Sequence, residues 1–293
     1  MKTNVVKFFL ILVLCLSSHS AIGKEFADVQ TFLTRLIKKI PPRPFSALTG
    51  SDFVRKVSLI AESERERSIL TQLAEGNLPD FLRRLKPVRL AYKFENGTAT
   101  IATIFVIPDY LAIGSDRDFL SIPMNLCTAT EIASKLGFIL PTKRMVEAIF
   151  EQSLFHFKPE PMPPSPRMRS MAYYSEHSQR IKEQRLALCC PLDTLVSGHK
   201  KDVVLTNRLD RERGKVAIYG WHRPSGIPIQ PLSTIHAATY ADYSHGIRLV
   251  SETVLIDDEP RSIYEVLEDP RLSRLLSDEG AIRSVRQLMA FRP

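Results

Sequence analysis

The sequence predicts a mixed α+β fold, and three observations favour that class. Helix-like apolar spacing dominates residues 24–157, where a β-hairpin signal interrupts it. Strand-like runs dominate residues 171–293, which end in short helical patterns. Residues 158–170 are rich in proline and favour extended backbone, as a linker or as a strap over the surface. We therefore expect a helix-rich N-terminal region, a proline-rich segment and a mostly antiparallel sheet with C-terminal helices; the two regions either share one core or form two.

The first 23 residues have the order of a secretory signal peptide. Lys2 precedes an apolar run over residues 8–16, and small residues follow it up to Gly23. The apolar run is too short for a transmembrane helix, which needs about 20 such residues. We therefore expect an exported protein, periplasmic or secreted, from which residues 1–23 are removed and in which no transmembrane segment remains.

Helices of the first region are predicted from apolar spacing and from residues that start or stop helices. They are expected at residues 27–40, 51–74, 79–85, 128–136 and 142–155. A Thr128-x-x-Glu131 capping box starts the fourth helix and Gly137 ends it.

Strands of the first region are predicted around a tight turn. Asn96-Gly97 accepts the positive φ angles of such a turn, so residues 88–94 and 98–107 are expected to pair as a hairpin. Short strands at 111–114 and 119–122 follow.

The second region begins with a polar helix and continues with strands. The helix is expected at residues 174–188, and the turn Arg223-Pro224-Ser225-Gly226 separates two of the strands. The strands are expected at 203–205, 215–221, 227–230 and 247–256, and C-terminal helices at 262–267, 272–276 and 282–289.

The charge of the chain indicates which classes of partner it binds. Forty Lys and Arg residues face 32 Asp and Glu, and this basic surplus is spread along the chain. Scattered basicity in an exported chain indicates no nucleic-acid partner and favours anionic envelope polymers or lipid headgroups.

Cys189 and Cys190 are adjacent and unsuited to bridging each other. Either Cys127 pairs with one of them, or all three are buried thiols that pack as small apolar groups.

The segment that indicates chemistry runs from His199 to His245. It holds four of the seven histidines and the only tryptophan. Imidazole gains or loses a proton near neutral pH, so its clustering beside Asp, Ser, Tyr and Lys favours acid-base, nucleophilic or metal-assisted catalysis. The candidate catalytic residues are His236, Asp242, Ser244 and His245.

A serine nucleophile at Ser244 needs a base from another element. Ser244 and His245 are neighbours and point apart on a strand, so His236 or His222 has to supply the base. In the alternative interpretation, Ser244 and His245 satisfy backbone groups of their loop.

The block from Ser244 to Leu249, Ser-His-Gly-Ile-Arg-Leu, resembles part of the catalytic block of L,D-transpeptidases. The resemblance implies an enzyme that cross-links peptidoglycan outside the cytoplasm. In that family a nucleophilic cysteine stands between the glycine and the aliphatic-Arg pair, and here that cysteine is absent. The family's second histidine lies upstream at a spacing that neither His236 nor His222 matches.

A metal site is a further alternative. His222, His236, Asp242 and His245 are residue types that bind Zn²⁺, with a position open for water. Their spacing matches no zinc signature such as H-E-x-x-H, and the other interpretation is that they are scattered structural histidines. Zinc therefore stays possible and no cofactor is required.

Basic and aromatic residues of the same segment suggest substrate binding. Lys200, Lys201 and Arg248 are candidates to hold an anionic group, although lysines at a strand edge also prevent unwanted strand pairing. The alternation of a strand places Tyr219 and Trp221 on one face, which with Tyr240 forms a stacking surface for sugar rings or else a core face.

Two functions follow from these residues. The first is an exported hydrolase or transferase acting on a cell-envelope or extracellular polymer, centred on the four candidate catalytic residues. The second is a non-catalytic envelope or extracellular binding or structural protein. Sequence alone does not decide whether the chain is an enzyme.

Overall fold

The computed structural model describes residues 31–290 and confirms the α+β class. Backbone contacts divide the chain into two units, residues 1–38 and 39–293. Within the first unit, residues 31–36 are helical, as the sequence predicts. The predicted signal peptide and the beginning of that helix lie outside the described residues.

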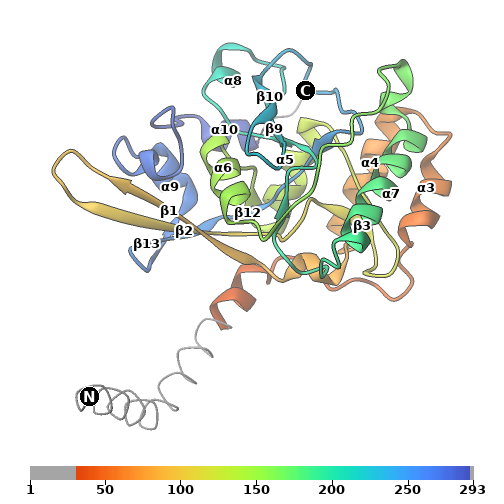
Figure 1. Ribbon diagram of the computed structural model, residues 1–293, viewed down its shortest axis with the longest axis horizontal. Coiled ribbons are helices and arrows are strands. Elements are labelled where there is room, and N and C mark those ends of the chain that lie inside the picture. Colours follow the sequence, from red (N-terminus) through yellow and green to blue (C-terminus); the bar gives the residue numbers. More distant parts are fainter. Residues whose placement is uncertain (1–30, 291–293) are drawn as a thin grey trace, which may run out of the picture. The chain divides into compact units, whose positions relative to one another are not determined.

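The largest sheet takes strands from both sides of the proline-rich segment. Its order is β14-β13-β2-β12-β5, with β1 paired to β2, and every pairing is antiparallel. The strands are β1 (Lys86–Lys93), β2 (Ala99–Val106), β5 (Phe138–Ile139), β12 (Val250–Ser251), β13 (Thr253–Ile256) and β14 (Glu259–Ser262). One sheet therefore joins the two predicted regions (Figure 1).

The predicted hairpin is confirmed as β1 and β2. Lys93 pairs with Ala99, and Gly97 closes the turn with a φ of +82°. In Figure 1 the hairpin extends on the side opposite to α3 and α7. The outer edge of β1 is protected, because the Gln152 side chain bonds to both the N–H and the carbonyl of Arg89.

The helices of the first half lie close to their predicted positions. They are α3 (Gly50–Val57), α4 (Glu62–Ala74), the 3₁₀ helix η1 (Asp80–Arg83), α5 (Leu126–Leu136) and α6 (Lys143–Gln152). The single helix predicted at 51–74 is two helices, and Ser58 lies at the break with its hydroxyl bonded to the Val54 carbonyl. The cap of α5 is Asn125, whose side chain accepts from the Thr128 N–H, so the predicted capping box at Thr128 is wrong.

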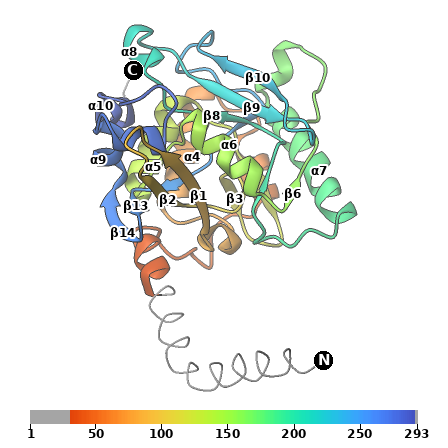
Figure 2. The same ribbon diagram turned by 60° about the vertical axis from the view of Figure 1, so that its left-hand side comes forward.

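A smaller sheet carries the histidine-rich segment. Its order is β10-β9-β8-β11, with β8 (Lys201–Val203), β9 (Ile218–His222), β10 (Pro228–Ser233) and β11 (His245–Gly246). β11 pairs parallel with β8, and the other pairings are antiparallel. Figure 2 shows this sheet next to α6.

The single strand predicted at 247–256 is not continuous. After β11 the chain crosses to the large sheet, with the Ile247 and Leu249 carbonyls accepting from Leu111 and Ile107. Only then do β12 and β13 begin, and the sequence did not predict β14. The remaining short elements are β3 (Ala112–Gly114), β4 (Phe119–Ser121), β6 (Phe155–His156), β7 (Val196–Ser197), α8 (Arg208–Arg211), α9 (Ile263–Glu268), η3 (Leu272–Leu275) and α10 (Val285–Met289).

The proline-rich segment is a strap. Its first residue, Lys158, exchanges two hydrogen bonds with the Gln184 side chain on α7 (Met171–Ala187). The Met162 N–H donates to the Tyr243 hydroxyl at 2.7 Å, and the Tyr243 N–H donates to the Met168 carbonyl. The strap ends in the 3₁₀ helix η2 (Pro166–Arg169). It therefore packs on the segment that leads into β11.

The three cysteines of the described residues are free thiols. Cys190 is buried, whereas Cys127 is half-buried and Cys189 is exposed. The alternative of three buried thiols is therefore wrong for two of them, and no disulfide joins Cys127 to the pair. None of the helices between residues 31 and 290 combines the length and the apolar composition of a membrane-spanning helix.

Candidate functional site

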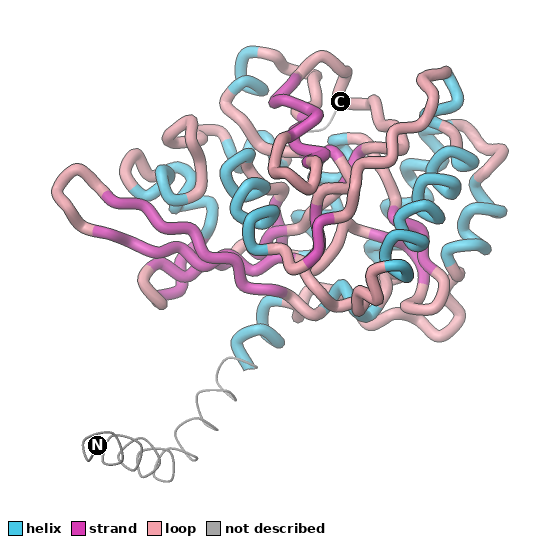
Figure 3. The backbone as a smooth tube through the Cα atoms, in the orientation of Figure 1, coloured by secondary structure: helices cyan, strands magenta, loops and turns pink. Residues whose placement is uncertain are grey.

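The four predicted catalytic residues and one predicted binding residue lie close together, in β11 and in the loop that precedes it. We call His236, Tyr240, Asp242, Ser244 and His245 the histidine cluster. All but His245 lie in the loop between β10 and β11. Figure 3 shows that such loops make up a large part of the backbone. Backbone hydrogen bonds fix both ends of the loop: the His236 carbonyl accepts from Val216 and the Ser244 carbonyl accepts from Lys201.

Tyr240 connects the members of the histidine cluster. The His236 ring stacks on the Tyr240 ring, with centroids 4.2 Å and planes 13° apart. The His245 ring meets the same tyrosine edge-on at 5.8 Å. The Tyr240 hydroxyl donates to Asp242 Oδ2 at 3.1 Å. One tyrosine therefore contacts both histidines and the carboxylate.

Ser244 is bonded to Asp242 and not to an imidazole. Its hydroxyl donates to Asp242 Oδ1 at 2.5 Å, and its N–H donates to the same oxygen at 2.8 Å. The residue is fully buried. This geometry differs from a Ser-His-Asp arrangement, in which the serine proton is directed to a histidine. It matches the alternative in which Ser244 satisfies groups of its own loop.

His245 is buried with both ring nitrogens unpaired among the described residues. Burial lowers the pKa of its imidazole to about 4, because the charged form is poorly solvated there and Lys201 is nearby. The ring is therefore neutral at pH 7. Burial also lowers the pKa of His236, with Lys201 and Lys215 acting in the same direction.

Asp242 is the anion of the histidine cluster. Burial alone would raise the pKa of its carboxyl, but the neighbouring His245 and Lys201 and the hydrogen bonds from Ser244 lower it below the usual value. Asp242 is therefore ionised at neutral pH, and its two oxygens accept from Tyr240 and Ser244.

Lys201 lies beside the histidine cluster, and Trp221 lies next to Lys201. Lys201 pairs with His245 in the β8–β11 ladder, and its Nζ is 5.0 Å from the centre of the Trp221 ring. The Trp221 indole N–H is buried and has no partner among residues 31–290. Three unpaired nitrogens, two on His245 and one on Trp221, thus flank a half-buried cation.

Trp221 and Tyr219 have different neighbours, contrary to the prediction from strand alternation. Trp221 has a φ of +55°, which interrupts the alternation of β9. Tyr219 packs with Val146 and Ala217, and its hydroxyl donates to Glu147 Oε1 at 2.8 Å. Both aromatic residues are buried, which matches the core alternative.

His222 does not join the histidine cluster. Its ring stacks on Phe150 of α6 at 4.6 Å and meets Tyr219 edge-on at 5.5 Å. Within the described residues, no group of three or more His, Cys, Asp or Glu side chains is placed to hold a metal ion. The described residues therefore give no support to the four-residue zinc set that includes His222.

Lys200 and Arg248, predicted to hold an anionic substrate group, are almost completely buried. Lys200 Nζ donates to the Tyr243 carbonyl at 2.6 Å, and burial lowers its pKa to about 7. Arg248 donates to the Ile107 and Val196 carbonyls at 3.0 and 2.7 Å. These contacts differ from the predicted role, because both cations bond to backbone inside the protein.

A buried ionic network that the sequence did not predict is centred on Asp109. Its carboxylate accepts from Arg185 Nη2 at 2.7 Å and from His199 Nε2 at 3.1 Å. Burial disfavours the charged carboxylate, but His199, Arg185 and Arg248 hold the pKa of Asp109 well below its usual range. Arg248 of the crossing segment therefore interacts electrostatically with this network.

A second pair, Tyr110 and Asp202, lies beside that network. The Tyr110 hydroxyl donates to Asp202 Oδ2 at 2.8 Å, and the Arg248 guanidinium lies 4.3 Å from the Tyr110 ring centre. Burial raises the pKa of the Asp202 carboxyl to about 7. The signal in the sequence is the Pro108-Asp109-Tyr110 step, which places an acid and a tyrosine side by side at the end of an apolar run.

Comparison with protein-family models, with curated proteins and with solved structures finds no match to this chain. The partial resemblance to L,D-transpeptidases therefore rests on the Ser244–Leu249 block alone. At the position of its nucleophile this chain has no cysteine, because Gly246 is followed directly by Ile247 and Arg248.

Proposed function

We propose that this chain is an exported, non-catalytic binding protein for an extracytoplasmic polymer, with the histidine cluster and Lys201 as its contact site. The observation that carries the proposal is the bonding of Ser244. Its hydroxyl is buried and donates to Asp242, so the serine of the cluster is not available as a nucleophile. Covalent hydrolysis or transfer needs a nucleophile beside a base.

The unpaired nitrogens around Lys201 support binding. Buried polar atoms in proteins almost always have a hydrogen-bond partner. Eleven buried side-chain atoms of residues 31–290 lack one, and three of them, on His245 and Trp221, lie next to Lys201. Lys201, His236 and Tyr240 are half-buried and meet a ligand at the surface, with Lys201 as the complement of a carboxylate. The three unpaired nitrogens are buried, and they bond to hydroxyl groups of a ligand that displaces the side chains covering them. A polymer that carries hydroxyl and carboxylate groups fits this combination.

The exported hydrolase or transferase remains a second candidate, and His245 favours it. Its imidazole is neutral at pH 7, lies beside the Asp242 carboxylate and has free nitrogens. A neutral imidazole activates a water molecule as a general base without any protein nucleophile. The test of the binding proposal therefore has to detect turnover as well.

The experiment uses the purified chain without residues 1–23 and insoluble peptidoglycan, the polymer that the partial resemblance suggests. Cosedimentation measures binding, and soluble sugar and peptide released over time measure turnover. We expect saturable cosedimentation without release. Lys201→Gln and His245→Phe should weaken binding, because they remove the cation and the unpaired nitrogens. Lys56→Gln is the matched control, since Lys56 is an exposed lysine of α3.

Each other outcome counts against the binding proposal. Release of soluble fragments that stops in His245→Phe would favour the enzyme instead. Equal loss of binding in Lys201→Gln and Lys56→Gln would show general charge attraction in place of a site. Absence of cosedimentation at low salt would exclude peptidoglycan as the polymer.

A further inference from the structure

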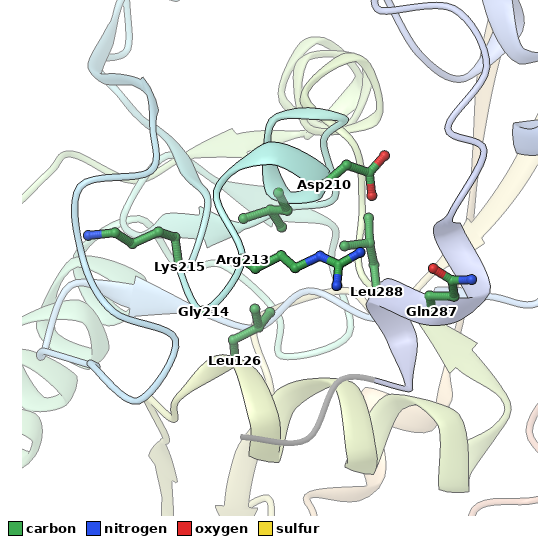
Figure 4. A pocket seen from close by; sticks show the side chains of 8 residues that line it. Leu126, Asp210, Arg213, Gly214, Lys215, Gln287 and Leu288 are labelled. Carbon is green, nitrogen blue, oxygen red and sulfur yellow. The ribbon is translucent and has the colours of Figure 1, made fainter.

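A pocket of about 230 Å³ opens between α5, α8 and α10 and shares no residue with the histidine cluster (Figure 4). Four parts of the chain form it: the start of α5, α8, the turn after α8 and the C-terminal helix. The lining residues are Leu126, Leu209, Asp210, Arg213, Gly214, Lys215, Gln287 and Leu288.

The floor of this pocket is aliphatic. Leu126 and Leu209 are buried, and Leu288 is half-buried against the same core cluster as Leu209. Three leucines from three helices thus face one small space. An aliphatic group that enters it gains about 25 cal/mol for each Å² of apolar surface removed from water.

Hydrogen bonds hold the walls in place without a ligand. The Leu126 N–H donates to the Ala238 carbonyl at 3.0 Å, and the Ala238 N–H donates to the Gly214 carbonyl at 2.7 Å. On the other side, the Ser284 hydroxyl donates to Asp210. Binding therefore requires little ordering of the walls, which favours affinity for a small ligand.

Arg213 is exposed and supplies the positive charge at this pocket, whereas Asp210, the anion of the same lining, accepts from the Ser284 hydroxyl. In Figure 4 its side chain crosses the opening between Leu126 and Leu288, and the Lys215 side chain points away. Lys215 Nζ bonds to the Ile235 carbonyl at 2.8 Å. Within residues 31–290, the Arg213 guanidinium has neither a hydrogen bond nor an ion pair. A guanidinium is the planar two-pronged complement of a carboxylate.

We propose that this pocket binds an aliphatic carboxylate, with the branched chain on the leucines and the carboxylate on Arg213. Two sources share this chemistry: a free branched-chain acid and the carboxyl-terminal leucine-like residue of a peptide. The proposal concerns binding alone, and the pocket does not change the ligand chemically.

Calorimetric or NMR titration with isovalerate and with acetyl-leucine tests the proposal and separates the two sources. We expect saturable binding of at least one acid. Isoamyl alcohol and acetyl-leucinamide have the same aliphatic group without the carboxylate, and we expect them to bind about tenfold more weakly or not at all. Tighter binding of isovalerate indicates the free acid, and tighter binding of acetyl-leucine indicates a peptide end.

Two variants locate the site. Arg213→Gln should weaken acid binding by about tenfold, and Arg211→Gln should leave it unchanged, because Arg211 is an exposed arginine of α8 that does not line this pocket. Equal thermal melting of both variants shows that folding is preserved. The proposal is overturned if neither acid binds, if the alcohol binds as well as isovalerate, or if the two variants lose binding equally.

Discussion

The unpaired ring of His245 makes a specific prediction for stability against pH. We consider the substitution His245→Phe, which keeps a ring of similar size next to Tyr240 and removes both nitrogens. In the folded protein, burial holds the pKa of His245 at about 4, whereas an exposed histidine has a pKa of about 6.5. The unfolded chain therefore takes up a proton at a higher pH than the folded chain does.

The sign and size of the effect follow from this difference. The stability contributed by the neutral ring is fully present above pH 6.5 and is lost as pH falls from about 6.5 to about 4. A pKa of about 4 in place of 6.5 corresponds to about 3 kcal/mol at the acid end of that range. The His245→Phe variant has no imidazole to protonate, so its free energy of unfolding does not fall for this reason. At pH 7.5 it should be as stable as the original protein or more stable by about 1 kcal/mol, because two unsatisfied buried atoms are gone.

Urea unfolding of both proteins at pH values from 7.5 to about 4 measures this difference. The free energy of unfolding of His245→Phe minus that of the original protein should rise steadily as the pH falls below 6.5. His236→Phe is the control, because His236 is half-exposed and its ring should contribute much less. A difference that stays constant over the whole range would refute the reasoning. A large loss of stability in His245→Phe at pH 7.5 would show that the ring nitrogens have partners after all.

Three further predictions concern contacts that hold the site. Arg185→Met leaves the buried Asp109 carboxylate without its closest cation and should lower the free energy of unfolding by about 3 kcal/mol, measured by urea unfolding at pH 7.5. Gly246→Ala places a Cβ 2.6 Å from Tyr110 Cδ1, so calorimetry should show a clear drop in melting temperature, and an unchanged melt would contradict the packing. Asn125→Ala removes the cap of α5 and should cost about 1 kcal/mol, whereas Asn125→Ser should restore most of it in the same unfolding assay.

Local chemistry explains which parts of the fold the sequence predicted. The Asn96-Gly97 turn was predictable because a turn of this type depends on two adjacent residues. Gly137 was predictable as the end of α5 for the same reason, and it has a φ of +84°. The strand predicted at 247–256 was not continuous, because residues 247–249 cross between the sheets and bond to Ile107 and Leu111, while the Arg248 side chain bonds to carbonyls 52 and 141 residues away. No periodicity within ten residues reports such distant partners.

The predictions for the site also succeeded where the contacting residues are close in the sequence and failed where they are distant. His236, Asp242 and His245 lie within one loop and the strand that follows it, so their proximity was predictable. His222 was misplaced because its position depends on Phe150, in a helix far away in the sequence. The contacts of Asp109 with Arg185 and His199 span 76 and 90 residues, and neither a composition nor a spacing pattern indicated them.

The block that resembles L,D-transpeptidases can be explained almost entirely by packing. Ser244 bonds to Asp242 within its loop, and the backbone of Gly246 fits closely against Tyr110 and Lys200. Arg248 bonds to two backbone carbonyls where the chain crosses between the sheets. Each of these residues is therefore needed by the fold whether or not any reaction occurs.

His245 differs from these residues, because its buried ring makes no hydrogen bond among residues 31–290, whereas the Arg248 guanidinium makes two. A fold that only required a flat ring at this position would be served equally well by phenylalanine, without the cost of two unsatisfied atoms. The imidazole is consequently the part of this block that packing does not explain, and His177 is a second buried ring of this kind, with both nitrogens unpaired among residues 31–290. The comparison of His245→Phe in unfolding and in polymer binding separates the two roles: a variant that gains stability and loses binding places the function at this ring.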